Sequence, residues 1–183
     1  MTAPFPRARE SRPGYDMAEV DSFLASAREA YAQLSGGVAE LRAADLRHMA
    51  FTLRKGGYSA PHVDAALERL EDAFALRERQ YAIAQQGEEA WLAEARATAQ
   101  DLVNRLARAP RERFTRAGLL TTGYNLRQVD AFADRISGYF RDGSVLTVDD
   151  VRTVSFAPQR GGYLEPQVDL LLDTVVDVML AVR

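Results

Sequence analysis

Apolar residues recur along this chain at alternating intervals of four and three positions in four separate segments. The positions are Val20, Leu24, Ala27, Tyr31 and Leu34; Val63, Leu67, Leu70 and Phe74; Val129, Ala133, Ile136 and Phe140; and Val168, Leu172, Val175 and Met179. This spacing places the apolar side chains on one face of a helix, over about two coiled-coil heptads. Helices of this length are marginal in water alone, so each must pack on another helix or on a partner. The pattern therefore predicts an all-α fold, in which four short amphipathic helices pair as helical bundles or short coiled coils.

One short motif precedes each of these helices, and it consists of Gly-Tyr, four variable residues and Val-Asp. The motif residues are Gly14, Tyr15, Val20 and Asp21 in copy one; Gly57, Tyr58, Val63 and Asp64 in copy two; Gly123, Tyr124, Val129 and Asp130 in copy three; and Gly162, Tyr163, Val168 and Asp169 in copy four. Each copy also has an upstream phenylalanine, which is Phe5, Phe51, Phe114 or Phe156. An internal repeat of this kind determines the architecture before any single residue does.

The residues after Gly-Tyr have the character of helix N-termini, and extended loops are expected before them. The glycine suits a position that needs positive φ or a close approach of two backbones. Asp16, Ser59 and Asn125 are good N-cap residues, and Glu19 would complete a capping box with Asp16. Leu164 cannot cap, so a looser start is expected for the fourth helix. The motif tyrosines are expected to act as hydrophobic staples, and the motif aspartates to face the helix dipole or a local cation.

Further helices are expected between and after the copies. The expected helices run over about 17–34, 38–49, 61–86, 88–107, 125–140 and 147–153, and from beyond Gly162 almost to Arg183. Ser35-Gly36-Gly37 is expected to end the first of them. Gly87 is either a weak point within one long helix or a break between two helices.

The four copies alternate in detail, and this alternation divides the chain into two similar halves. The Phe-to-Tyr distance is 10 residues in copies one and three and 7 residues in copies two and four. Copies two and four share Gly-Gly-Tyr-x-x-Pro-x-Val-Asp, whereas copies one and three share Val-Asp-x-Phe. Duplication of a two-copy unit explains this pattern. We expect one repeat pair over 1–86, a helical linker over 87–109 and a second repeat pair over 110–183.

Composition and charge narrow the class of protein. Apolar residues make up 47% of the 183 residues, and the formal net charge of −3 does not favour wholesale nucleic-acid binding. The chain has no cysteine, so disulfides and thiolate metal sites are excluded. No apolar run follows a basic start, so no secretory signal is expected. The apolar stretch 170–182 contains Asp173 and Asp177 and is too short and too charged to span a bilayer.

The residue pattern does not favour catalysis. His48 and His62 are the only histidines, and His62 occupies a helix-start position of the repeat. Walker, dinucleotide-binding, zinc-protease and nucleophile-elbow motifs are absent. The arginines from Arg105 to Arg116 suggest nucleic-acid binding, but Glu112 and the glutamates upstream favour a mixed solvated surface. We therefore expect a non-enzymatic protein without cofactor or metal, for which nucleic acid is a disfavoured partner.

The repeat resembles the N-terminal domain of DivIVA, a bacterial scaffold of cell division and polar growth. Copy one carries the resemblance most fully, in Gly14-Tyr15-Asp16 and Val20-Asp21-Ser22-Phe23-Leu24. The spacings from Phe51 to Tyr58 and from Phe156 to Tyr163 are similar as well. Four tandem copies in an Ala- and Arg-rich chain resemble the DivIVA-domain repeat proteins of actinobacteria.

The resemblance implies parallel helix pairing, with the loop before Gly-Tyr crossing at the end of the pair and presenting apolar and basic residues to a membrane. By position, the loop tips of this chain are Arg12, Arg54, Lys55, Leu119, Leu120 and Arg160. The implied function is a cytoplasmic, non-enzymatic scaffold that binds proteins of cell division or the cell envelope, or further copies of itself. The alternative is a peripheral membrane-binding module that brings the basic and leucine-bearing loops to an anionic surface at the septum or pole. Pairing of the copies within one chain and pairing between chains are both compatible with the sequence.

Overall fold

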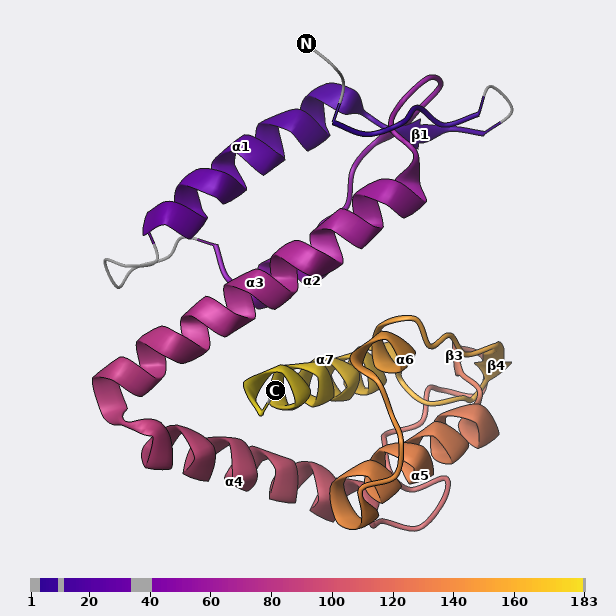
Figure 1. Ribbon diagram of the computed structural model, residues 1–183. Helices are drawn as coiled ribbons and strands as arrows, with labels where there is room; N and C mark the ends of the chain where they lie inside the picture. Colours follow the sequence, from indigo (N-terminus) through magenta and orange to yellow (C-terminus); the bar gives the residue numbers. More distant parts are fainter. Residues whose placement is uncertain (1–3, 10–11, 34–40, 183) are drawn as a thin grey trace. The chain divides into compact units, whose positions relative to one another are not determined.

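The computed structural model describes residues 4–9, 12–33 and 41–182, and most of these residues are helical (Figure 1). The helices are α1 (Met17–Gln33), α2 (Ala43–Arg47), α3 (Ala60–Gln86), α4 (Glu88–Leu106), α5 (Leu126–Asp142), α6 (Val148–Arg152) and α7 (Glu165–Ala181). Two short antiparallel pairs contain the strands β1 (Gly14–Tyr15) with β2 (Leu53–Arg54) and β3 (Thr122–Tyr124) with β4 (Pro158–Arg160). The all-α prediction is confirmed.

The chain divides into two compact units, 1–87 and 88–183. α3 ends just before Gly87 and α4 begins just after it, so this glycine is a break between two helices. Its φ of 89° is one that L side chains rarely adopt, and its amide donates to the carbonyl of Ile83 at 2.9 Å. The segment 87–109, expected as a helical linker, forms α4, which packs on α5 and α7 within the second unit.

The first unit builds its core from the predicted apolar stripes of α1 and α3. Val20 of α1 lies in one buried cluster with Val63 and Leu67 of α3. Further along α3, Phe74 is fully buried and packs with Leu46 of α2. The stripe of α3 therefore packs on α1 along its length, as the contact of Tyr31 with Phe74 shows, and α2 joins this core at Phe74.

The second unit packs α4 on α5 and on α7, and α6 on α7. The stripes again face the core, because Val129 and Ile136 of α5 and Val168 and Val175 of α7 are each at most 2% exposed. Since the period of four and three is the period of one helix face, these positions could be identified before any partner was known.

One short helix precedes the second copy in each unit, α2 in the first and α6 in the second. α2 (Ala43–Arg47) is shorter than the expected 38–49, whereas the predicted stop Ser35-Gly36-Gly37 and Leu34 lie outside the described residues. α6 begins at the predicted capping box, in which the Thr147 hydroxyl accepts the Asp150 amide at 3.0 Å. Bonds from the Thr147 amide and hydroxyl lower the pKa of the Asp150 carboxyl.

The helix starts of copies one and three have the predicted side-chain caps. Asp16 Oδ1 accepts the amides of Ala18 at 2.9 Å and Glu19 at 3.1 Å. Asn125 Oδ1 accepts the amide of Gln128 at 3.1 Å. These bonds satisfy first-turn amides that have no partner inside the helix.

The helix starts of copies two and four form without a side-chain cap. Ser59 makes no such bond, and its hydroxyl lies 2.9 Å from His62 Nδ1. Leu164 has no capping group, yet α7 begins directly after it at Glu165, with Pro166 in the first turn. Proline suits this position because its missing amide would have no helical partner there.

Candidate functional site

The two copies within each unit are joined at their Gly-Tyr segments by reciprocal backbone hydrogen bonds. In the first unit Tyr15 and Tyr58 each donate an amide to the other's carbonyl at 2.9 Å. Tyr124 and Tyr163 do the same at 2.9 Å in the second unit. Copy one therefore pairs with copy two, and copy three with copy four, inside a single chain. We call each of these two joints a crossing.

The motif glycine is required because the two backbones approach too closely for any side chain. A Cβ at any of these glycines would overlap a carbonyl oxygen of the other copy, and none of the four has positive φ. The glycine–carbonyl pairs are Gly14 with Tyr58, Gly57 with Tyr15, Gly123 with Tyr163 and Gly162 with Tyr124. Of the two reasons that the sequence offered for this glycine, close approach is the one that applies.

Each upstream phenylalanine packs its ring on the motif tyrosine of the other copy. The ring centroids are 5.4 Å apart for Phe5–Tyr58, 5.4 Å for Phe51–Tyr15, 5.2 Å for Phe114–Tyr163 and 5.3 Å for Phe156–Tyr124. The angles between the ring planes lie between 56° and 70°, which brings a ring edge toward a ring face. The tyrosine thus packs as a hydrophobic residue, as predicted, but its partner belongs to the neighbouring copy.

The motif aspartate accepts a hydrogen bond from the tyrosine hydroxyl of the other copy. In the first unit Tyr58 donates to Asp21 at 3.1 and 3.2 Å to the two carboxylate oxygens. Burial raises the pKa of Tyr58, and the bond to Asp21 raises it further. The pKa of Tyr15 is raised by burial and by the charge and hydrogen bond of Asp64. The aspartates therefore connect two copies, a role that the helix dipole alone does not explain.

The second unit repeats this contact with larger effects on the tyrosines. Tyr163 is completely buried and donates to Asp130 at 2.9 Å, and burial with this bond raises its pKa to about 12. Burial, together with the charge and hydrogen bond of Asp169, raises the pKa of Tyr124 to about 12. Both hydroxyls are consequently protonated donors throughout the physiological range.

The first residue after each motif tyrosine donates its amide to the other copy, directly after that copy's phenylalanine. The donor–acceptor pairs are Asp16–Thr52 at 2.8 Å, Ser59–Pro6 at 2.9 Å, Asn125–Ala157 at 2.9 Å and Leu164–Thr115 at 2.9 Å. The bond to Thr52 occupies the amide of Asp16, so only one half of the predicted capping box forms, in which Asp16 accepts the amide of Glu19. The loop of one copy is instead held by the helix start of the other.

In three of the four pairs, the residue three positions after the donor accepts a hydrogen bond from the same loop. Glu19 accepts the amide of Thr52 at 2.8 Å, and Gln128 accepts that of Ala157 at 2.7 Å. Gln167 accepts the amide of Thr115 at 2.9 Å. In the remaining pair the loop residue is proline, which has no amide, and His62 stands in the position of the acceptor.

A buried arginine supports the crossing of the second unit. Arg113 is 6% exposed; it donates to the Asp130 carbonyl at 2.6 Å and to the Asp134 carboxylate at 2.5 Å. Its Nη1 also lies 3.8 Å from Asp130 Oδ1, and the amide of Arg111 donates to Asp130 Oδ2 at 2.9 Å. The prediction that Arg105 to Arg116 form a solvated surface is therefore wrong for Arg113. No signal in the sequence distinguishes it from its neighbours, since burial follows from the contact with α5.

The predicted loop tips lie on the surface, and they differ between the units. Arg12 and Lys55 are exposed, while the guanidinium of Arg54 lies 2.6 Å from the Asp16 carboxylate. Leu119 and Leu120 are 85% and 92% exposed. Arg160 is exposed at the end of β4, where it pairs with Thr122 of β3.

Within the described ranges, no group of three or more His, Asp or Glu side chains is arranged to hold a metal ion. Among the same residues, no helix is long and apolar enough to cross a membrane. Comparison with protein-family models, with curated proteins and with solved structures finds no match.

Proposed function

We propose that the chain is a non-enzymatic, DivIVA-like interaction module, in which crossed repeat pairs hold helix faces and loops in place for protein partners. The supporting observation is that the glycine, tyrosine, aspartate and phenylalanine of every copy contact the other copy of the same unit. The motif residues therefore join the two copies of each unit and leave the helix faces and loops for partners.

Apolar side chains left on the helix surfaces supply candidate docking positions. Leu76 and Tyr81 of α3 are 54% and 37% exposed, and Leu170 of α7 is 63% exposed. Burial of exposed leucine and tyrosine against a partner stabilises the complex, because apolar area is removed from water. The partners that we propose are proteins of bacterial cell division or the cell envelope, or further copies of this chain.

A pull-down from actinobacterial cells, combined with localisation of a fluorescent fusion, tests this proposal. We expect division or envelope proteins to co-purify and the fusion to gather at the septum or pole. The double variant Leu76→Glu with Leu170→Glu should reduce both signals, whereas Gln80→Glu, at an exposed polar position of α3, should not. Diffuse localisation, with no such partner retained, would contradict the proposal.

A second candidate function, peripheral membrane binding, is favoured by the exposure of Leu119 and Leu120. These side chains occupy one tight turn, closed by the Thr121 amide donating to the Gly118 carbonyl at 2.8 Å. Arg160 lies on the adjoining β3–β4 pair. Two leucines beside a cation suit shallow insertion at an anionic surface.

Flotation with vesicles that contain anionic lipid separates this second function from the first. We expect co-flotation that is lost in the Leu119→Glu, Leu120→Glu variant and retained in Val145→Glu. Val145 is a fitting control because it is 90% exposed in the same unit but outside the turn. Equal flotation of all three proteins, or none with the unsubstituted chain, would rule out insertion of this turn.

A further inference from the structure

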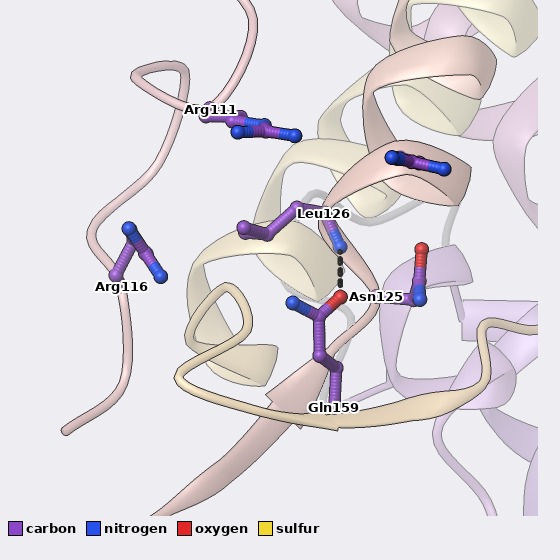
Figure 2. A pocket seen from close by; sticks show the side chains of 6 residues that line it. Arg111, Arg116, Asn125, Leu126 and Gln159 are labelled. Carbon is purple, nitrogen blue, oxygen red and sulfur yellow. Dashed lines mark hydrogen bonds between the residues drawn. The ribbon is translucent and has the colours of Figure 1, made fainter. Parts of the chain in front are cut away.

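A hollow of about 410 Å³ opens beside the first turn of α5, and three arginines line it. Arg111 and Arg116 come from the approach loop of copy three, and Arg127 comes from α5. Figure 2 shows Arg111 and Arg116 on the loop side of the hollow, facing Asn125, Leu126 and Gln159, which complete its lining. This volume lies within the range of small-molecule binding sites.

The positive charge of these three arginines is not neutralised by the protein. Within the part of the chain that the structure describes, none of the three forms an ion pair, and no acidic side chain lines the hollow. Arg116 Nε donates to the carbonyl of Gly161 at 3.0 Å, which fixes the guanidinium without neutralising it. The nearby Asp130 is occupied by Arg113, a backbone amide and a tyrosine hydroxyl.

The backbone at Arg111 is held in an unfavourable conformation that keeps this arginine beside the hollow. Its φ is 70°, and among the described residues it is the only non-glycine with positive φ. The Arg111 amide donates to the buried Asp130 carboxylate at 2.9 Å, which holds the conformation in place. Strain of this kind costs about 1 kcal/mol or more and is commonly found at functional sites.

The remaining polar groups around the hollow are also donors. Gln159 Oε1 accepts the amide of Leu126 at 3.1 Å, the bond drawn in Figure 2, so its NH₂ group is left to donate. Asn125 Oδ1 accepts the amide of Gln128, which leaves its NH₂ group in the same state. The positive end of the α5 dipole adds to the field of the arginines.

The equivalent place in the first unit carries less uncompensated positive charge. There Arg7 corresponds to Arg116, but Asp16 replaces Asn125, Ala18 replaces Arg127 and Arg54 replaces Gln159. The guanidinium of Arg54 lies 2.6 Å from the Asp16 carboxylate. The described residues of the second unit therefore hold more uncompensated positive charge at this place than those of the first.

We propose that this hollow binds a small molecule through a phosphate or diphosphate group. The guanidinium groups would each offer paired N–H donors to phosphate oxygens, and Leu126 would contact the organic part of the ligand. Such a ligand site goes beyond the docking function and does not depend on it.

Titration calorimetry of the full chain with pyrophosphate and with inorganic phosphate tests this site. We expect saturable binding with one site per chain, and tighter binding of pyrophosphate because it carries more charge. The double variant Arg111→Gln with Arg127→Gln should bind at least about tenfold more weakly. Arg141→Gln removes an exposed arginine from the last turn of α5 and should change the affinity less than about twofold.

A second variant tests the charge without disturbing the fold. Asn125→Asp keeps the N-cap and restores the carboxylate found at the same position of copy one, so it should weaken pyrophosphate binding by about tenfold. Unchanged circular dichroism would show that the variant is folded. Absence of saturable binding by the unsubstituted chain, or equal affinities in all variants, would overturn the proposal.

Vesicles containing phosphatidic acid distinguish a lipid headgroup from a soluble ligand. Displacement of the protein from these vesicles by pyrophosphate, lost in the Arg111, Arg127 double variant, would identify the headgroup as the source. Pyrophosphate binding in calorimetry without vesicle binding would identify a soluble phosphorylated molecule. Vesicle binding that neither pyrophosphate nor the double variant reduces, with no pyrophosphate binding in calorimetry, would overturn the site.

Discussion

The two units join their copies with the same residues, yet they place their buried ion pairs differently. In the second unit Arg113 lies directly under the crossing, against Asp130 and Asp134. In the first unit the buried pair joins α2 to α3, where Arg47 Nη2 lies 2.7 Å from Glu71 Oε1. The repeat thus fixes the crossing, while the charges around it are free to differ. The second unit accordingly keeps three arginines without an ion pair at a place where the first unit pairs Arg54 with Asp16.

The largest effect is expected from adding a methyl group at a crossing glycine. Gly162→Ala should cost more than about 4 kcal/mol of the second unit's stability, because the new Cβ meets backbone that cannot move aside. Gly57→Ala should do the same to the first unit. Denaturant unfolding followed by circular dichroism and by the fluorescence of Trp91, the single tryptophan, assigns the loss, since α4 belongs to the second unit.

The matched control for the glycine substitutions is Gly118→Ala. A Cβ there meets only the Thr121 hydroxyl at 3.5 Å, so little change is expected. A loss as large as that of Gly162→Ala would show that close approach is not the reason for the motif glycine.

Removal of a buried arginine should cause the next largest loss of stability, and each substitution should affect only its own unit. Arg113→Met leaves the Asp130 carboxylate buried without its cation and should cost about 3–5 kcal/mol in the second unit. Arg47→Met removes the guanidinium that lies 2.7 Å from the Glu71 carboxylate, which is 2% exposed, and should lower the stability of the first unit. Trp91 fluorescence should register the first substitution and not the second; the reverse result would contradict this placement of charge.

Loss of a tyrosine hydroxyl should be more costly in the second unit than in the first. Tyr163→Phe removes a bond from Asp130, which is 7% exposed, and should cost about 1–3 kcal/mol. Tyr58→Phe releases Asp21, which is exposed and can bind water, so about 0.5–1.5 kcal/mol is expected. Equal losses in chemical denaturation would show that burial of the aspartate does not set the cost.

Alkaline pH should weaken the second unit over a defined range. The pKa values of Tyr124 and Tyr163 are raised from 10.0 to about 12 in the folded chain, so their contribution is complete below pH 10 and is lost as the pH rises toward 12. Absorbance of tyrosinate, followed together with Trp91 fluorescence, should show late ionisation coupled to unfolding. Tyr163→Phe should remove part of this dependence, and an unchanged loss of stability between pH 10 and 12 in that variant would refute it.

The smallest effect is expected at the helix caps. Asn125→Ala removes the bond to Gln128 and should cost about 1 kcal/mol. Ser59→Ala removes no capping bond and should be close to neutral. Thermal unfolding of the two variants measures the difference, and a larger loss for Ser59→Ala would contradict these assignments.

Much of the fold could be predicted because it follows from periodicity and from repetition. The stripe from Val129 to Ile136 is a property of one helix, and its burial follows once any partner covers it. The sequence alone does not decide whether Gly87 breaks the helix, because a glycine inside a helical pattern is compatible with both outcomes. The caps at Asp16 and Asn125 were predictable because they depend on neighbours within a few residues.

What the sequence determined by itself was local: four helix starts, their apolar faces and the recurrence of Phe, Gly-Tyr and Val-Asp around them. Only the tertiary structure decided that the Tyr58 hydroxyl meets Asp21 and that Glu19 holds Thr52, because these residues are more than thirty positions apart. The arginine-lined hollow belongs to the same category. Arg116 and Gln159 come together only when the loop of one copy crosses the other, and the spacing of residues along the sequence does not predict this contact.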